Sequence, residues 1–74
     1  MLLIPVKLGK CRLGEILSEK GWEQQYLASL LKMHEAQVSH YVRGHRKMSL
    51  VTAMNISLIL GINIDELYEW HETD

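Results

Sequence analysis

The sequence predicts an all-α domain of five short helices, preceded by a short extended arm. Apolar residues recur at intervals of three and four over most of the chain, which is the spacing of one face of a helix. Gly21, Gly44 and Gly61 directly follow three of these periodic segments, at the position where helices commonly end. With 74 residues, 47% of them hydrophobic and 23% charged, the chain has the composition of one small globular domain. A domain this small keeps little stability after the entropy cost of folding, so we expect dense packing or a partner subunit.

Residues 1–10 are predicted to form the N-terminal arm, with a possible edge strand. The run from Leu2 to Val6 is aliphatic around Pro5, which holds the residue before it extended and disfavours a helix. Such an arm either packs across the domain or pairs with a second subunit. The apolar run is short, follows no basic region and meets Lys7 at once, so we expect neither a signal peptide nor a membrane span.

The domain proper is predicted to span residues 11–70. Its first helix runs from about Cys11 to Lys20 and ends at Gly21, with an inward face formed by Leu13, Ile16 and Leu17. Trp22 is expected to fill the space between the first and second helices. Cys11 is expected to be a half-buried structural residue. A single cysteine forms no internal disulfide, which fits a reducing compartment and the expected cytoplasmic location.

Two helices joined by a tight turn follow. The second begins at Glu23 or Gln24 and ends at Leu31, and the third runs from Glu35 to Val42. The residues that form their buried seam are Leu27, Ala28, Leu31, Val38, Tyr41 and Val42. The residues on the outer side of the third helix are Ala36, Ser39, His40 and Arg43, with Gln37 beside them. A buried seam with a polar outer face is the pattern of a helix-turn-helix reader of DNA.

Ser49 is a predicted N-cap for a fourth helix from about Leu50 to Leu60. A short fifth helix is expected around Asp65 to Trp70, followed by an acidic tail at residues 71–74. The residues assigned to the core face of the fourth helix are Leu50, Ala53, Ile56, Ser57 and Leu60. The apolar residues partly outside this face are Val51, Met54 and Leu58. They form a candidate dimer patch, although single apolar residues on a surface are common.

The charges divide the chain into two halves, although the formal net charge is only −1. All eight basic residues lie between Lys7 and Lys47, where four glutamates oppose them and leave +4. The remainder carries five acidic residues and no lysine or arginine. A basic half is what binding to phosphates requires, and a solvated charge distribution with no partner is the alternative.

Several landmarks agree in their spacing: GWEQQYLA from Gly21, Val38-Ser39, Arg43-Gly44 with Arg46, Ser49-Leu50, and LGINIDEL from Leu60. In these features the sequence resembles the Cro/CI-type (XRE-like) helix-turn-helix regulators of phages and bacterial chromosomes, over roughly residues 11–70. The closing LYEW is similar to small phage-type members. The resemblance implies a lambda-repressor-like fold and a transcriptional regulator that binds double-stranded DNA. We expect a repressor acting on an operator as a homodimer, with no cofactor and no small-molecule substrate.

The resemblance also implies roles for individual residues. Those expected to read base edges are Glu35, Ala36, Ser39 and His40. Those expected to contact phosphates are Gln24, Gln37, Arg43, His45, Arg46 and Lys47. The side-chain chemistry agrees, because a glutamate accepts from cytosine N4, an alanine touches a thymine methyl and a histidine donates to guanine. The cations after the third helix also have a structural interpretation, since the helix dipole favours positive charge at its C-terminal end.

Two residues depart from the family pattern. Lys32 occupies the turn position where the family usually has glycine, and a left-handed conformation there costs another residue roughly 1 kcal/mol. Glu35 adds a negative charge to the face that would meet DNA.

Other functions find little support in the sequence. The segment from His34 to Val38 begins like a zinc-protease HExxH motif but has valine in place of the second histidine. We therefore expect neither a metal site nor an enzyme. The alternative to a DNA-binding regulator is a protein-interaction module, such as an antitoxin-like partner, that uses the same fold.

Overall fold

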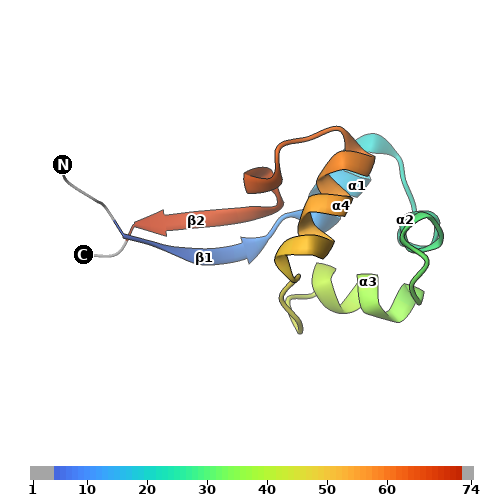
Figure 1. The fold of residues 1–74 in the computed structure, drawn as a ribbon, viewed down its shortest axis with the longest axis horizontal. Coiled ribbons are helices and arrows are strands. Elements are labelled where there is room, and N and C mark those ends of the chain that lie inside the picture. The colour runs from blue at the N-terminus through green and yellow to red at the C-terminus, as the bar shows by residue number, and fades with distance from the viewer. Residues whose placement is uncertain (1–4, 73–74) are drawn as a thin grey trace.

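The computed structural model describes residues 5–72 and contains four α-helices, one 3₁₀ turn and a two-stranded sheet. The elements in chain order are β1 (Val6–Cys11), α1 (Leu13–Lys20), α2 (Gln24–Leu31), α3 (Glu35–Val42), α4 (Leu50–Leu60), η1 (Ile64–Leu67) and β2 (Tyr68–Glu72). The helices gather at one end, and β1 and β2 project together from them as an extension that we call the β-arm (Figure 1). The two strands come from opposite ends of the chain and pair antiparallel.

The prediction of an all-α, five-helix fold is therefore wrong. The expected fifth helix is replaced by η1, a single turn in which the Asn63 backbone N–H donates to the Glu66 carboxylate at 2.7 Å, and by β2. Tyr68 and Trp70 belong to residue types that favour strands, and β1 offers them a hydrogen-bonding edge from the other end of the chain. A window of local sequence contains no information about that edge. The first four residues, including part of the expected edge strand, and the last two lie outside the described part of the chain.

The β-arm begins with regular pairing of Val6 with Glu72 and of Lys7 with His71, and its register shifts before Cys11. Gly9 lies inside β1 at this irregularity. A Cβ atom on Gly9 would stand 2.9 Å from the main-chain oxygen of Glu69 and would also overlap the His71 ring. Glycine is needed here because the backbone of β2 approaches too closely for a side chain.

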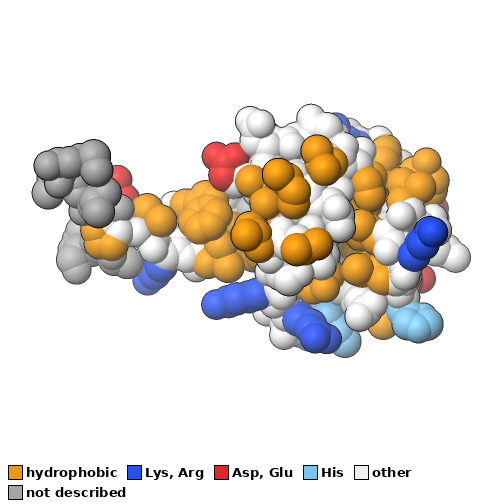
Figure 2. Space-filling model, viewed as in Figure 1, with side chains coloured by type: hydrophobic (Ala, Val, Ile, Leu, Met, Phe, Trp, Pro, Cys, Tyr) orange, Lys and Arg blue, Asp and Glu red, His pale blue; other side chains and the backbone are white. Residues whose placement is uncertain are grey.

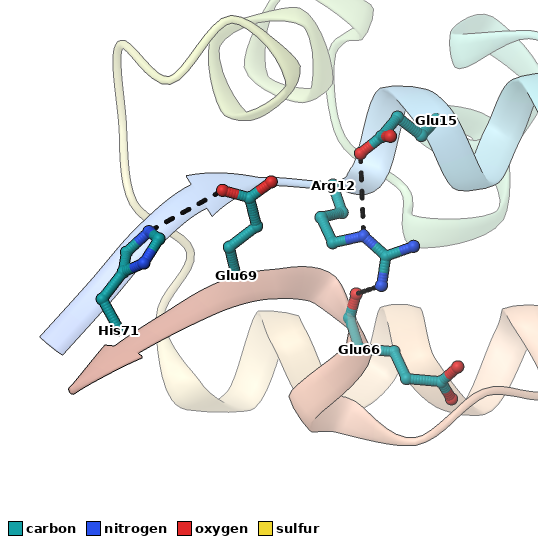
Figure 3. Close-up of polar contacts among 5 residues, drawn as sticks. All are labelled: Arg12, Glu15, Glu66, Glu69 and His71. Carbon is teal, nitrogen blue, oxygen red and sulfur yellow. Dashed lines mark hydrogen bonds and ion pairs between the residues drawn. The ribbon is translucent and has the colours of Figure 1, made fainter. Parts of the chain in front are cut away.

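Polar contacts join the base of the β-arm to the helices (Figure 3). The backbone N–H of Arg12 donates to the carbonyl of Leu67 at 2.7 Å, and its guanidinium lies 3.4 Å from the carbonyl of Glu66. The Arg12 guanidinium also lies 3.6 Å from the carboxylate of Glu15 in α1. The start of α1 is therefore held against η1, which fixes where β2 must begin.

The core lies among the four helices and is closed at the base of the β-arm by Cys11 of β1 and Leu67 of η1. Its fully or nearly fully buried apolar members are Cys11, Leu13, Ile16, Leu17, Leu27, Ala28, Val38, Tyr41, Ala53, Ile56, Leu60 and Leu67. The predicted seam between the second and third helices is confirmed. Trp22 is half-buried against this core and meets the ring of Tyr26 edge to face, with ring centroids 5.0 Å apart.

Two local predictions are confirmed and two are wrong. Lys32 adopts the left-handed conformation, with φ 56° and ψ 44°, and the hydroxyl of Ser49 caps α4 by accepting the backbone N–H of Thr52 at 3.1 Å. Leu50 was assigned to the core face but is 79% exposed, because the first residue of α4 points away from the bundle. Cys11 is buried rather than half-buried and is the last residue of β1, two residues before α1 begins.

Candidate nucleic-acid interface

The outer face of α3 carries the four residues predicted to read bases. Val38 and Tyr41 anchor the helix in the core and thereby orient the opposite side outward. Glu35, Ala36 and His40 are exposed, and Ser39 is half-buried. A carboxylate in the first turn is also stabilised by the helix dipole, so Glu35 has a structural role whether or not it meets a base.

A groove of about 860 Å³ runs between this face and the junction of α1 with α2. Five of the ten predicted site residues line it: Gln24, Glu35, Ala36, Ser39 and Arg43. Its other wall includes Gly14, Ser18 and Trp22. The groove therefore joins the first residue of α2 to the outer face of α3, two segments that sequence reasoning placed together only through the family resemblance.

The N-terminal end of α2 opens into this groove. Gln24 is the first residue of the helix, and its N-cap residue Glu23 makes no side-chain cap hydrogen bond. The first turn of α2 holds no acidic residue. Free backbone N–H groups at the positive end of a helix dipole attract anions, so this end can receive a phosphate.

The remaining predicted phosphate contacts lie beyond the end of α3. Gly44, with φ 77°, lets the chain reverse, and the backbone N–H groups of His45 and Arg46 return to the carbonyl of His40 at 2.9 and 3.3 Å. The imidazole rings of His40 and His45 stand 6.1 Å apart. His45, Arg46 and Lys47 are exposed, whereas Gln37 is half-buried and lines none of the grooves formed by the other site residues.

A second, smaller pocket of about 230 Å³ lies between this loop and the β-arm. Four cations line it: Lys10, Arg43, Arg46 and Lys47. Lys10 was not among the predicted site residues. A single lysine in an extended arm gives no signal of its own, and its proximity to the loop depends on the pairing of β1 with β2.

Cations outnumber carboxylates around the two sites: Lys10, Arg43, His45, Arg46 and Lys47 are exposed there, against Glu23 and Glu35 in the groove. Figure 2 shows Lys, Arg and His side chains along the lower edge of the molecule, below α4 and along the β-arm. Within residues 5–72 the ion pairs are Arg12 with Glu15 and His71 with Glu69, and neither involves a cation of the second pocket. The excess positive charge of the N-terminal half is therefore available to a polyanion.

Two side chains have pKa values that the fold shifts, and both pack in or against the core. Burial raises the pKa of the Cys11 thiol and also that of the Tyr68 hydroxyl. A thiol with a raised pKa is protonated at neutral pH and is a poor nucleophile. Over the described residues no group of three or more His, Cys, Asp and Glu side chains converges as metal ligands would. No helix among them is long and apolar enough to span a membrane.

The α2–turn–α3 unit, with a buried seam and a polar outer face beside exposed cations, defines the chain as a helix-turn-helix protein of the DNA-binding class. The family model of the Cro/C1-type HTH DNA-binding domain matches residues 12–73, and the chain belongs to that family. A comparison with curated proteins found no significant match. The resemblance seen in the sequence is thus confirmed, and DNA is the partner of the domain.

Proposed function

We propose that this protein is a sequence-specific transcriptional repressor that occupies an operator in double-stranded DNA as a homodimer. One observation carries the DNA-reading part of the proposal. Three outward residues of α3 (Glu35, Ala36 and Ser39) line one groove with Gln24 of α2 and Arg43, and an exposed cationic loop follows α3. A protein that occupies an operator blocks access to that DNA, so we assign repression through occupancy of the site.

The residues divide into two roles. Glu35, Ala36, Ser39 and His40 contact base edges in the major groove, where each base pair presents a distinct pattern of donors and acceptors. Gln24 and Gln37, together with the cations Arg43, His45, Arg46 and Lys47, contact the backbone. Phosphate contacts set register and affinity, whereas base contacts set the preferred sequence.

These roles predict different responses to substitution. In a binding-site selection followed by gel-shift titration, His40→Ala changes the preferred sequence, whereas Arg46→Ala weakens binding to all sequences. Each lost phosphate contact lowers the slope of log K against log salt by about 0.9. Lys20→Ala is the matched control, because it removes one exposed positive charge from the last turn of α1, outside both grooves. An unchanged preferred sequence for His40→Ala would refute its assigned role.

The proposal that the protein is a homodimer rests on the outer face of α4. None of its 11 residues is charged, and Leu50, Val51, Met54 and Leu58 are 79%, 71%, 48% and 70% exposed. Figure 2 shows these hydrophobic side chains gathered over α4. A helix that is apolar on all sides is normally covered. We infer that a second copy covers it.

An apolar hollow of about 340 Å³ lies beside this face and offers a second copy a concave surface to fill. It is formed between α4 and the β-arm, with Leu8, Leu50, Ile64 and Trp70 in its lining. The exposed apolar side chains on α4, together with Trp70, provide roughly 250–450 Å² of apolar surface per subunit that a dimer could bury. A standard homodimer interface needs roughly 500 Å² of apolar area per subunit, so α4 and Trp70 together supply half of it or more.

Sedimentation equilibrium tests the dimer. Wild type is expected to sediment as a dimer and Leu58→Lys as a folded monomer, because an ammonium group at the centre of the interface loses its hydration. Val6→Lys is the control, since it makes a similar change at a residue that is 56% exposed at the tip of the β-arm. A wild-type protein that is monomeric at every soluble concentration would exclude the homodimer.

The second candidate function is a protein-interaction module of the antitoxin-like kind, and the exposed apolar face of α4 is the observation that favours it. The two functions differ in one measurement. A wild-type protein that binds no duplex at low salt, neither random nor genomic, is not a DNA-binding regulator, and the interaction module then takes its place.

A further inference from the structure

The basic pocket beside the β-arm is built from segments that are far apart in the sequence. Lys10 comes from β1, Arg43 from the end of α3, and Arg46 and Lys47 from the loop that follows. Gly9, Gly44 and Tyr68 contribute to the walls between these cations. The pocket therefore exists only because the β-arm packs against the end of α3.

Strand pairing and one hydrogen bond to a side chain hold its walls in place. Cys11, next to Lys10, pairs with Tyr68 across the β-arm. The hydroxyl of Tyr68 accepts the backbone N–H of Met48 at 3.0 Å, which ties the end of the cationic loop to β2. Because both walls are fixed, the ordering of the backbone has been completed before any ligand arrives.

The charges of the pocket favour an anion. No acidic residue lines it, and Glu69, which is nearby in β2, lies 3.7 Å from the ring of His71. Four cations around a small volume repel one another, and an anion between them relieves that repulsion. The volume of about 230 Å³ is several times the roughly 30 Å³ share of one water in the liquid, so it admits a phosphate group and part of its hydration.

We propose that this pocket binds a phosphate of the DNA backbone and that Lys10 makes the β-arm a second DNA-contacting element. The inference rests on the proposed function. Arg43 lines both this pocket and the groove at α3, so the two sites lie side by side along one surface. The pocket then receives a phosphate outside the base pairs that α3 reads. The helix dipole accounts for cations after α3, but it gives no reason for a lysine of β1 beside them.

Salt-dependent titration of a DNA duplex tests the role of Lys10. Lys10→Ala is expected to lower the slope of log K against log salt by about 0.9, so raising salt from 50 to 200 mM costs it about three-fold less affinity than wild type. Lys10→Arg keeps the wild-type slope. Lys7→Ala is the matched control, because Lys7 is exposed in the same strand but pairs with His71 and does not line the pocket.

A second measurement locates the phosphate. In duplexes that carry one neutral methylphosphonate at successive positions, the difference in affinity between wild type and Lys10→Ala is expected to vanish at one position beside the half-site. Equal effects of Lys10→Ala and Lys7→Ala, or no effect of Lys10→Ala while wild type binds, would overturn this inference and leave the proposed function intact. Failure of wild type to bind any duplex would overturn both. Thermal melting confirms that each variant is folded.

Discussion

Lys32 holds the turn of the helix-turn-helix in a conformation that suits glycine better than lysine. Among the described residues it is the one non-glycine with positive φ, at 56°. The conformation is imposed by main-chain hydrogen bonds, in which the N–H of Lys32 donates to Ser29 at 3.3 Å and that of Met33 to Ala28 at 3.1 Å. A substitution by glycine keeps both bonds and removes the contact between Cβ and the carbonyl oxygen that makes this region unfavourable.

The size of the effect follows from two opposing free energies. Relief of the left-handed conformation is worth about 1–2 kcal/mol, whereas the extra freedom of glycine in the unfolded chain costs about 0.4–1 kcal/mol. Lys32→Gly should therefore stabilise the fold by roughly 0.5–1 kcal/mol. For a domain of this size that raises Tm by roughly 2–8 °C.

Urea denaturation followed by circular dichroism measures the change, and Lys32→Ala is its control. Alanine removes the ammonium group and the long side chain but keeps the backbone strain, so its stability should stay close to wild type. The side chain of Lys32 is exposed, so little packing is lost in either variant. If alanine stabilised the domain as much as glycine, or if glycine destabilised it, the strain argument would be refuted.

Three further predictions concern the β-arm, a helix cap and pH. Gly9→Ala should lower Tm and loosen the β-arm, seen as faster amide exchange there, because its Cβ would stand 2.9 Å from the main-chain oxygen of Glu69. Ser49→Ala should cost about 0.5–2 kcal/mol in urea denaturation, since its hydroxyl accepts a 3.1 Å hydrogen bond at the start of α4. Burial raises the pKa of the Cys11 thiol from 9.0 and that of Tyr68 from 10.0, so the unfolded chain deprotonates first and stability should fall as pH rises above about 9. Cys11→Ala should weaken that alkaline loss in pH-dependent melts, and an equal loss in this variant would contradict the assignment to the thiol.

The parts of the fold that the sequence predicted depend on local signals. Glycine after a periodic segment, serine before one and the three-to-four spacing of apolar residues placed α2, α3 and α4 within a residue of their ends. The strands could not be predicted in this way. Residues 68–72 carry an ambiguous pattern, and what makes them a strand is the edge of β1, about sixty residues earlier in the chain.

The candidate site likewise contains residues that local sequence predicts and residues that depend on distant contacts. Residues on one helix face, such as Ala36 and Ser39, follow from helical geometry once the buried seam is known. Gln24 joined them through the family resemblance, and the structure places it in the same groove. Lys10 could not be found, because the contact that brings it to Arg46 is made by the β-arm. The exposure of Leu50 was predicted wrongly for another reason. Periodicity shows which residues share an apolar face, but it does not show whether that face packs in the core or lies on the surface.

The β-arm separates the two proposed contact surfaces and forms a wall of each. Leu8 and Tyr68 line both the basic pocket beside the cationic loop and the apolar hollow beside α4. A change confined to α4 should therefore weaken self-association but leave the affinity of a monomer for a single half-site unchanged. A change confined to the loop should lower that affinity and leave self-association unchanged. A change that unpairs β1 from β2 removes a wall from both, so Gly9→Ala should weaken the two together. A loss of both DNA affinity and self-association in Gly9→Ala would show that both surfaces depend on the β-arm, the element that local sequence did not predict.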